Sequence, residues 1–284
     1  MCRLVAYTGY DLLLANVLVK PIDSLVKQSL SAKESTTMTN GDGFGVGWYA
    51  PDISPDPALF LSILPAWNDE NLLHLTNKIQ SNLFFAHVRA ASAGGVNSFN
   101  CHPFIYKNWM FMHNGGIENF LAIKRPLKAL LDDDLYNWIR GETDSEHLFA
   151  LFLQLAKNKD LTRLDTVAEV LNETFQMVDK LLHQFSKPKP GYAYYNICLT
   201  DGVRIVASRY STDPTILQES LHYLEGEYFW SRENYLSTKT LSNQHCVLIA
   251  SEKLTDLNET WQTVPPSHFI LVDNNYQLTL KPII

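Results

Sequence analysis

The order of apolar segments along this chain most constrains how it can fold. Segments with the pattern of buried strands stand near both ends, and segments with helical periodicity lie between them. Strands are expected at residues 3–8, within 40–49 after a glycine-rich turn, and at 83–88, 109–112, 192–200, 204–208, 228–231, 246–251, 269–273 and 277–281. This order predicts one α+β domain with layered packing. A doubly wound sheet is the alternative, although strict βαβ alternation is missing.

Helical periodicity and turn residues divide the rest of the chain. Helices are expected at residues 23–32, 70–80, 117–131 with an interruption near Pro126, 146–155 and 166–185. Three prolines predict a loop at 51–57, and small polar residues predict a long, functional loop at 90–102. Asp201 and Gly202 are typical of a hairpin turn.

Composition restricts the classes of partner. Of the 284 residues, 46% are hydrophobic, which suffices for a buried core, and the net charge of −7 without a basic run argues against nucleic acid. No apolar segment is long enough to cross about 30 Å of hydrocarbon. The first 20 residues also lack the pattern of a signal peptide. We therefore expect no membrane partner and a cytoplasmic location.

The four cysteines are Cys2, Cys101, Cys198 and Cys246. They form no CxxC pair, so neither a zinc site nor a redox dithiol is expected, and we predict no metal and no cofactor. Cys198 and Cys246 are expected to be small buried side chains. The glycine-rich segment 40–48 lacks the Lys-Ser/Thr of a P-loop and precedes a strand, which argues against phosphate binding.

Cys2 becomes the amino-terminal residue if Met1 is trimmed. It would then carry a thiol and an α-amine with a pKa of about 7.7–8.0, which can take the thiol proton. The thiolate is the reactive form of cysteine. A trimmed but inert terminus is the ordinary alternative for a lone cysteine at this position. Cys101 and His102 form a second, weaker candidate for a nucleophile and base.

Three further motifs carry polar groups suited to a binding site. Arg89 follows an apolar strand and could bind a carboxylate bidentately, or bond loop carbonyls. The Asn114 amide and the Gly115 N–H could form an oxyanion hole, or an ordinary turn. Asp144 could hold a substrate ammonium, although Asp144 or Ser145 could simply cap the following helix.

In combination these motifs resemble the class II glutamine amidotransferase family of the N-terminal nucleophile hydrolase superfamily. The matching segments occur in the family's order within residues 1–160: Cys2, then 40–48, 87–89, 100–103, 113–119 and 143–146. Residues 3–7, 247–252, Trp261 and 264–265 resemble a stand-alone branch of the family. That branch includes the γ-glutamyl hydrolases of ergothioneine synthesis and glutathione breakdown.

The resemblance implies a fold and a set of roles. The fold would be a four-layer αββα sandwich of two mostly antiparallel sheets, formed by a single domain over residues 1–284 with completing strands in 190–284. Cys2 would be the nucleophile, and Asn114 and Gly115 would stabilise the oxyanion. Arg89 would bind the α-carboxylate and Asp144 the α-ammonium of a γ-glutamyl group. Residues that would line the pocket are His102 and Ser92.

The resemblance also has departures. Ala90 follows Arg89, where transferases of the family carry a tryptophan, and no segment after residue 160 resembles a domain that would receive ammonia. These features favour hydrolysis of a γ-glutamyl amide, with glutamine or a small γ-glutamyl conjugate as substrate, through a thioester on Cys2. The alternatives are a glutaminase subunit that passes ammonia to a separate synthase, and a catalytically silent γ-glutamyl-binding protein. A homodimer is also compatible with the sequence.

Overall fold

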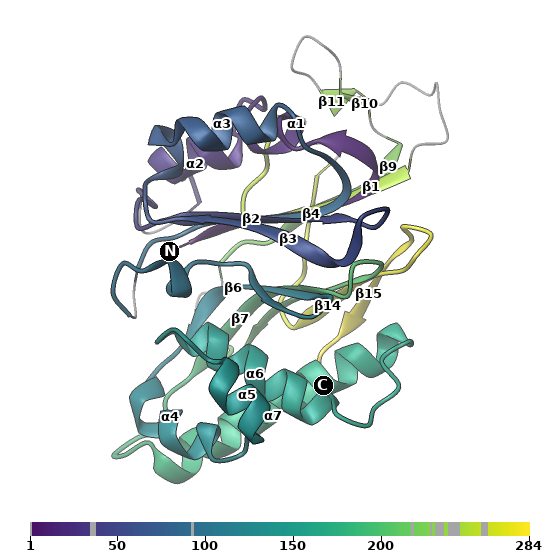
Figure 1. Ribbon diagram of the computed structural model, residues 1–284. Helices are drawn as coiled ribbons and strands as arrows, with labels where there is room; N and C mark the ends of the chain where they lie inside the picture. Colours follow the sequence, from purple (N-terminus) through teal and green to yellow (C-terminus); the bar gives the residue numbers. More distant parts are fainter. Residues whose placement is uncertain are drawn as a thin grey trace.

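Two antiparallel sheets lie face to face, and helices cover the outer face of each (Figure 1). The computed structural model describes residues 2–34, 38–91, 94–216, 219–227, 229–230, 236–237, 245–256 and 261–284. This arrangement confirms the expected αββα sandwich. Within the described residues, no helix has the length and apolar character needed to cross a membrane.

The seven-stranded sheet contains the strand that follows Cys2. Its strands, in spatial order, are β13 (Gln262–Thr263), β9 (His222–Glu227), β12 (His245–Ala250), β1 (Arg3–Leu13), β4 (Gln80–Val88), β2 (Phe44–Ala50) and β3 (Ser54–Ser62). Strand β1 therefore lies inside the sheet, between β4 and β12, and is antiparallel to both. The outer face is covered by α1 (Ala15–Leu18), α2 (Leu25–Leu30) and α3 (Glu70–Thr76), seen above the sheet in Figure 1.

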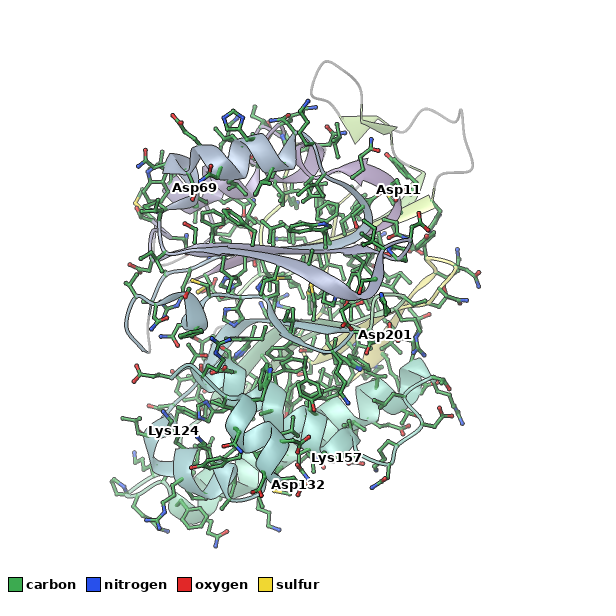
Figure 2. The ribbon with its side chains drawn as sticks, in the orientation of Figure 1. Asp11, Asp69, Lys124, Asp132, Lys157 and Asp201 are labelled. Atoms are coloured by element: carbon green, nitrogen blue, oxygen red, sulfur yellow. The ribbon has the colours of Figure 1, made fainter. Side chains whose placement is uncertain are left out.

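The six-stranded sheet carries the second half of the site. Its strands, in spatial order, are β15 (Leu278–Pro282), β14 (His268–Val272), β8 (Ile205–Ser211), β7 (Ala193–Thr200), β6 (Trp109–Ile117) and β5 (Phe104–Tyr106). Its helices are α4 (Phe120–Lys128), α5 (Asp133–Trp138), α6 (Asp144–Ala156) and α7 (Leu164–Phe185). Charged residues such as Asp132 and Lys157 lie on the outside of this helical layer (Figure 2). A short ribbon of β10 (Phe229–Trp230) and β11 (Leu236–Ser237) and two short 3-10 turns, Ala66–Asn68 and Ser98–Asn100, complete the described elements.

The alternation of side chains along β1 separates two buried layers. Val5 and Tyr7 pack toward the helices, whereas Leu4 and Ala6 pack toward the other sheet. Met112 of β6 belongs to the layer between the sheets. The nucleophile candidate and the oxyanion candidate thus come from facing sheets.

The prediction of a loop at 51–57 is wrong for its second half. Strand β3 begins at Ser54 and includes Pro55 and Pro57. It is the edge strand of its sheet, paired only with β2 among the described strands. An edge strand tolerates proline because one row of its N–H groups needs no partner strand.

The strand expected to end at residue 112 continues to Ile117. The segment His113 to Gly116 is therefore strand and not a turn, and it pairs with β7. The following helix begins at Phe120, later than expected, and it includes Pro126 instead of being interrupted there. Proline removes one backbone donor, and α4 ends two residues later, at Lys128.

Other boundaries differ in smaller ways. The helix expected at 70–80 ends at Thr76, because Gln80 already begins β4. The hairpin at Asp201 and Gly202 is confirmed, with Gly202 at a φ of +93°. The strands β5 and β9 and the helix α5 were not expected. The strand expected at 228–231 has its end residues, Tyr228 and Ser231, outside the described part of the chain.

Candidate active site

Cys2 lies at the start of β1 against the chain that leaves β4. Its thiol sulfur accepts a hydrogen bond from the N–H of Ala90 at 3.4 Å and lies 3.5 Å from the carbonyl oxygen of the same residue. Burial raises the pKa of this thiol, while the bond from Ala90 and the charge of Arg89 act in the opposite direction. A thiol with a raised pKa needs a base to become the reactive thiolate.

Arg89 is fixed by the backbone on both sides. Its N–H donates to the carbonyl of Gly43 at 2.8 Å, and its carbonyl accepts from the N–H of Asp42 at 3.0 Å. Its guanidinium donates to the carbonyl oxygens of Gly95 at 3.2 Å and Gly94 at 3.4 Å. Arg89 therefore makes the bonds to loop carbonyls that were the alternative to carboxylate binding. These bonds orient its buried guanidinium, and the next residue, Ala90, contacts Cys2.

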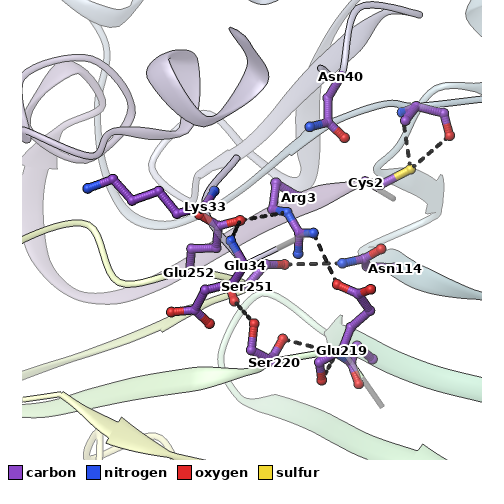
Figure 3. A network of polar contacts seen from close by, with 12 residues as sticks. Cys2, Arg3, Lys33, Glu34, Asn40, Asn114, Glu219, Ser220, Ser251 and Glu252 are labelled. Carbon is purple, nitrogen blue, oxygen red and sulfur yellow. Dashed lines mark hydrogen bonds and ion pairs between the residues drawn. The ribbon is translucent and has the colours of Figure 1, made fainter. Parts of the chain in front are cut away.

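Asn114 lies on the inner face of β6, buried with only 1% of its surface exposed. Its side-chain nitrogen donates to the hydroxyl of Ser251 at 3.3 Å, and Figure 3 shows the amide on the side of the network that carries Cys2. Gly115 follows it in the strand. A methyl group on Gly115 would lie 2.1 Å from the carbonyl oxygen of Tyr194, so no side chain fits there.

Asp144 is the first residue of α6, and its carboxylate points to the end of β6. One oxygen accepts from the N–H of Ile117 at 2.8 Å and the other from the N–H of Ser145 at 2.8 Å. Neither Asp144 nor Ser145 is the helix cap, contrary to that expectation. The cap is Thr143, whose hydroxyl accepts from the N–H of Glu146 at 3.2 Å. The carboxylate is instead tied to the strand that bears Asn114.

The structure argues against a nucleophile and base made of Cys101 and His102. The Cys101 thiol contacts the carbonyls of Ser62 and Asn97, and burial raises its pKa to about 11. The ring of His102 packs 4.3 Å from the ring of His87, and neither of its nitrogens has a hydrogen-bond partner within the described part of the chain. Burial also holds the pKa of His102 well below its usual value.

The two expected pocket-lining residues fare differently. His102 is 4% exposed, and its ring packs between the rings of His87 and Phe104. Ser92 lies outside the described residues. Among the described residues no cluster of His, Cys, Asp and Glu could hold a metal ion.

Comparison with known proteins assigns the family. A family model described as class-II glutamine amidotransferases matches residues 1–280. The chain belongs to this family. The probable glutamine amidotransferase DUG3 of Saccharomyces cerevisiae is 37% identical over all of this chain and 85% of its own length. This class II glutamine amidotransferase is accordingly an amidohydrolase.

More distant relatives agree with the family and the fold. The γ-glutamyl-hercynylcysteine sulfoxide hydrolase of Mycolicibacterium smegmatis is 28% identical over 42% of this chain and 52% of its own. A class-II domain protein from Silicibacter pomeroyi has a similar structure, with a TM-score of 0.67, 24% identity and full coverage of both chains. The glutamine phosphoribosylpyrophosphate amidotransferase of B. subtilis gives a TM-score of 0.62 at 13% identity, covering this whole chain and 49% of its own.

Tyr194 is a residue of this amidotransferase that the sequence did not single out. It pairs with Gly116 across β6 and β7, and its hydroxyl lies 3.4 Å from where a side chain on Gly116 would begin. Burial raises the pKa of Tyr194 to about 12, with further contributions from Asp144 and Cys2. The phenol of Tyr194 therefore lies within electrostatic range of both Asp144 and Cys2. A predicted strand that continued through residue 116 would have placed Tyr194 opposite Gly116.

Arg3 is a second such residue: the sequence places it in a buried strand but predicts no ion pair for it. Its side chain is fully buried and forms ion pairs with Glu219 at 3.0 Å and Glu252 at 3.1 Å (Figure 3). Glu252 in turn accepts from the backbone N–H groups of Lys33 and Glu34. The strand that carries the nucleophile candidate is therefore anchored by charge immediately after Cys2.

Proposed function

We propose that this protein hydrolyses γ-glutamyl amides through Cys2 after removal of Met1. The observation that carries the proposal is the contact between the Cys2 thiol and Ala90, which follows Arg89 directly. It brings a nucleophile beside a buried cation suited to a carboxylate. The relative from Mycolicibacterium smegmatis, named for γ-glutamyl hydrolysis, supports the same class of substrate.

The reaction follows from the groups around the amide. The α-amine of Cys2 takes the thiol proton, and the sulfur attacks the carbonyl carbon of the γ-glutamyl amide. The Asn114 amide and the Gly115 N–H stabilise the resulting oxyanion. The carbon–nitrogen bond then breaks, and the leaving amine takes the proton from the α-ammonium. Water hydrolyses the thioester, which releases glutamate and restores the thiol.

Two charged residues match the charges at the head of the substrate. A γ-glutamyl group carries an α-carboxylate and an α-ammonium, and Arg89 and Asp144 offer the complementary charges. Glutamine is the smallest such substrate, and a small γ-glutamyl conjugate is the alternative leaving group. No cofactor enters this scheme.

The test uses protein whose loss of Met1 has been verified by intact mass. It is incubated with glutamine and a panel of γ-glutamyl conjugates, and glutamate release is followed. We expect release by the wild type and by Cys101→Ser, and none by Cys2→Ala. If the wild type released no more glutamate than Cys2→Ala on every compound, the proposal would fail. Binding of the same compounds without release would then favour a silent binding protein.

A further inference from the structure

Ser251 connects the two sheets at the candidate active site. It follows β12 directly, and it is fully buried. Its hydroxyl accepts from the N–H of Leu4 at 3.1 Å and from the side-chain nitrogen of Asn114 at 3.3 Å (Figure 3). Leu4 belongs to the seven-stranded sheet and Asn114 to the six-stranded sheet. One oxygen atom thus joins the nucleophile strand to the oxyanion candidate.

The position of Ser251 is itself fixed by the backbone. Its N–H donates to the carbonyl of Leu4 at 3.0 Å, so Ser251 and Leu4 are linked in both directions. Its carbonyl accepts from the hydroxyl of Ser220 at 2.8 Å. The next residue, Glu252, pairs with Arg3. The segment that follows β12 therefore holds β1 at the two residues after Cys2.

The chemistry of an amide explains why this contact matters. The side-chain nitrogen of Asn114 carries two hydrogens in one plane. Donation of one hydrogen to Ser251 fixes that plane and so fixes the direction of the other hydrogen. Oxyanion stabilisation depends on donors that are already oriented before charge develops.

We propose that Ser251 is a positioning residue, which holds the Asn114 amide at a set place relative to Cys2. The inference rests on the proposed function, because it assigns Asn114 to the oxyanion. Ser251 does not contact the reacting atoms in this scheme. It acts by keeping a donor on one sheet in register with a nucleophile on the other.

The kinetic test removes the hydroxyl, while the bond from the Ser251 N–H to the carbonyl of Leu4 remains and still links the two strands. Ser251→Ala is expected to lower kcat by about tenfold to a hundredfold, somewhat less than loss of an oxyanion donor, with KM within about twofold of the wild type. Ser251→Thr retains a hydroxyl and should recover most of kcat. The matched control is Ser208→Ala. Ser208 is equally buried, and its hydroxyl donates to the backbone carbonyl of Tyr195 at 2.9 Å.

A double-mutant cycle separates positioning from general damage. In an Asn114→Ala background, Ser251→Ala should change kcat by less than about twofold, because the amide that it orients is gone. Ser208→Ala should have the same small effect in both backgrounds. If Ser251→Ala lowered kcat equally in both backgrounds, or raised KM instead of lowering kcat, the inference would be overturned.

A structural measurement keeps the inference independent of the substrate. A crystal structure of Ser251→Ala should show the Asn114 amide rotated or in more than one orientation, and an amide in its original place would overturn the inference. If the wild type released no glutamate, the proposed function would fail, and this measurement would still decide the role of Ser251. If the wild type is active and Ser251→Ala keeps full kcat, only the positioning role fails.

Discussion

The carboxylate of Asp144 accepts a hydrogen bond of 2.8 Å from the backbone N–H of Ile117, the last residue of β6. The candidate ammonium ligand is therefore attached to the same strand as Asn114 and Gly115. In the proposed binding mode, one strand would set the distance between the residues for the head and those for the amide of a γ-glutamyl group. Binding and chemistry can thus be perturbed separately by changes on either side of this contact.

Asp144→Asn should weaken binding while the fold is retained. The asparagine oxygen can still accept from Ile117, although the bond from the N–H of Ser145 is lost, and a neutral amide does not pair with an ammonium. We expect KM for a γ-glutamyl substrate to rise by roughly tenfold to a hundredfold, the worth of a charge-assisted hydrogen bond. Steady-state kinetics measures this. The control is Glu142→Gln, an exposed acid two residues earlier, and an unchanged KM in Asp144→Asn would contradict the assignment.

Gly115→Ala should destabilise the protein. The added methyl group would lie 2.1 Å from the carbonyl oxygen of Tyr194, so the two strands must separate. A loss of about 2–3 kcal/mol in the free energy of unfolding is expected, and chemical denaturation measures it. Gly95→Ala is the control, because a methyl group there has no atom within 4 Å. Equal stability of the two variants would refute this reading of β6.

Arg3→Met should lower the free energy of unfolding much more than loss of a surface cation does. It leaves Glu219 and Glu252 buried without their shared partner, which costs about 3–5 kcal/mol. Lys157→Met is a matched control, because Lys157 also bridges two carboxylates, at 2.8 and 3.0 Å, but on the exposed helical layer (Figure 2). Thermal unfolding should show a large drop for Arg3→Met and little change for Lys157→Met. Similar drops would contradict the anchoring role of Arg3.

Acid should destabilise the fold through its buried histidines. Burial lowers the pKa of His87 to about 3 and that of His147 to about 4, whereas an unfolded histidine titrates near 6.5. The unfolded state therefore binds more protons below about pH 6.5. The contribution of the neutral histidines to the free energy of unfolding is therefore complete above about pH 6.5. It is lost as the pH falls toward 4 for His147 and toward 3 for His87.

His147→Gln tests this pH dependence. The variant removes one histidine of lowered pKa, so the slope of unfolding free energy against pH between about 4.5 and 6 should decrease by roughly 1 kcal/mol per pH unit. Denaturant titrations at several pH values measure the slope. His268→Gln is the control, since His268 lies on the half-exposed end of β14. The histidine explanation would be lost if His147→Gln left the slope unaltered.

The sequence predicted the layers better than the edges of the elements. The periodicity of residues 166–185 and the hairpin at Asp201 follow from local chemistry, and the structure contains both. The prolines of β3 show where local reasoning fails, because their tolerance depends on a position at the sheet edge. The predicted end of β6 at residue 112 is wrong for a similar reason. Asn114-Gly115 is typical of a turn, and pairing with β7 keeps it extended.

The site shows the same division. Resemblance to a family, and not spacing alone, predicts that the site contains Cys2, Arg89, Asn114 and Asp144. The contact between Ser251 and Leu4 joins residues 247 positions apart, and no local pattern predicts it. Burial of Arg3 likewise depends on Glu219 and Glu252, which come from the other end of the chain.

The place of β1 inside its sheet has a consequence for synthesis. One of its neighbours, β4, is made early, but the other, β12, begins only at His245. A growing chain on the ribosome therefore carries Cys2, Arg89, Asn114 and Asp144 long before the second neighbour of β1 exists. Products of premature termination before His245 would contain all four residues and still lack one of the two strands that flank β1. Translation of the last strands is thus the step that encloses the strand of the candidate nucleophile between two neighbours.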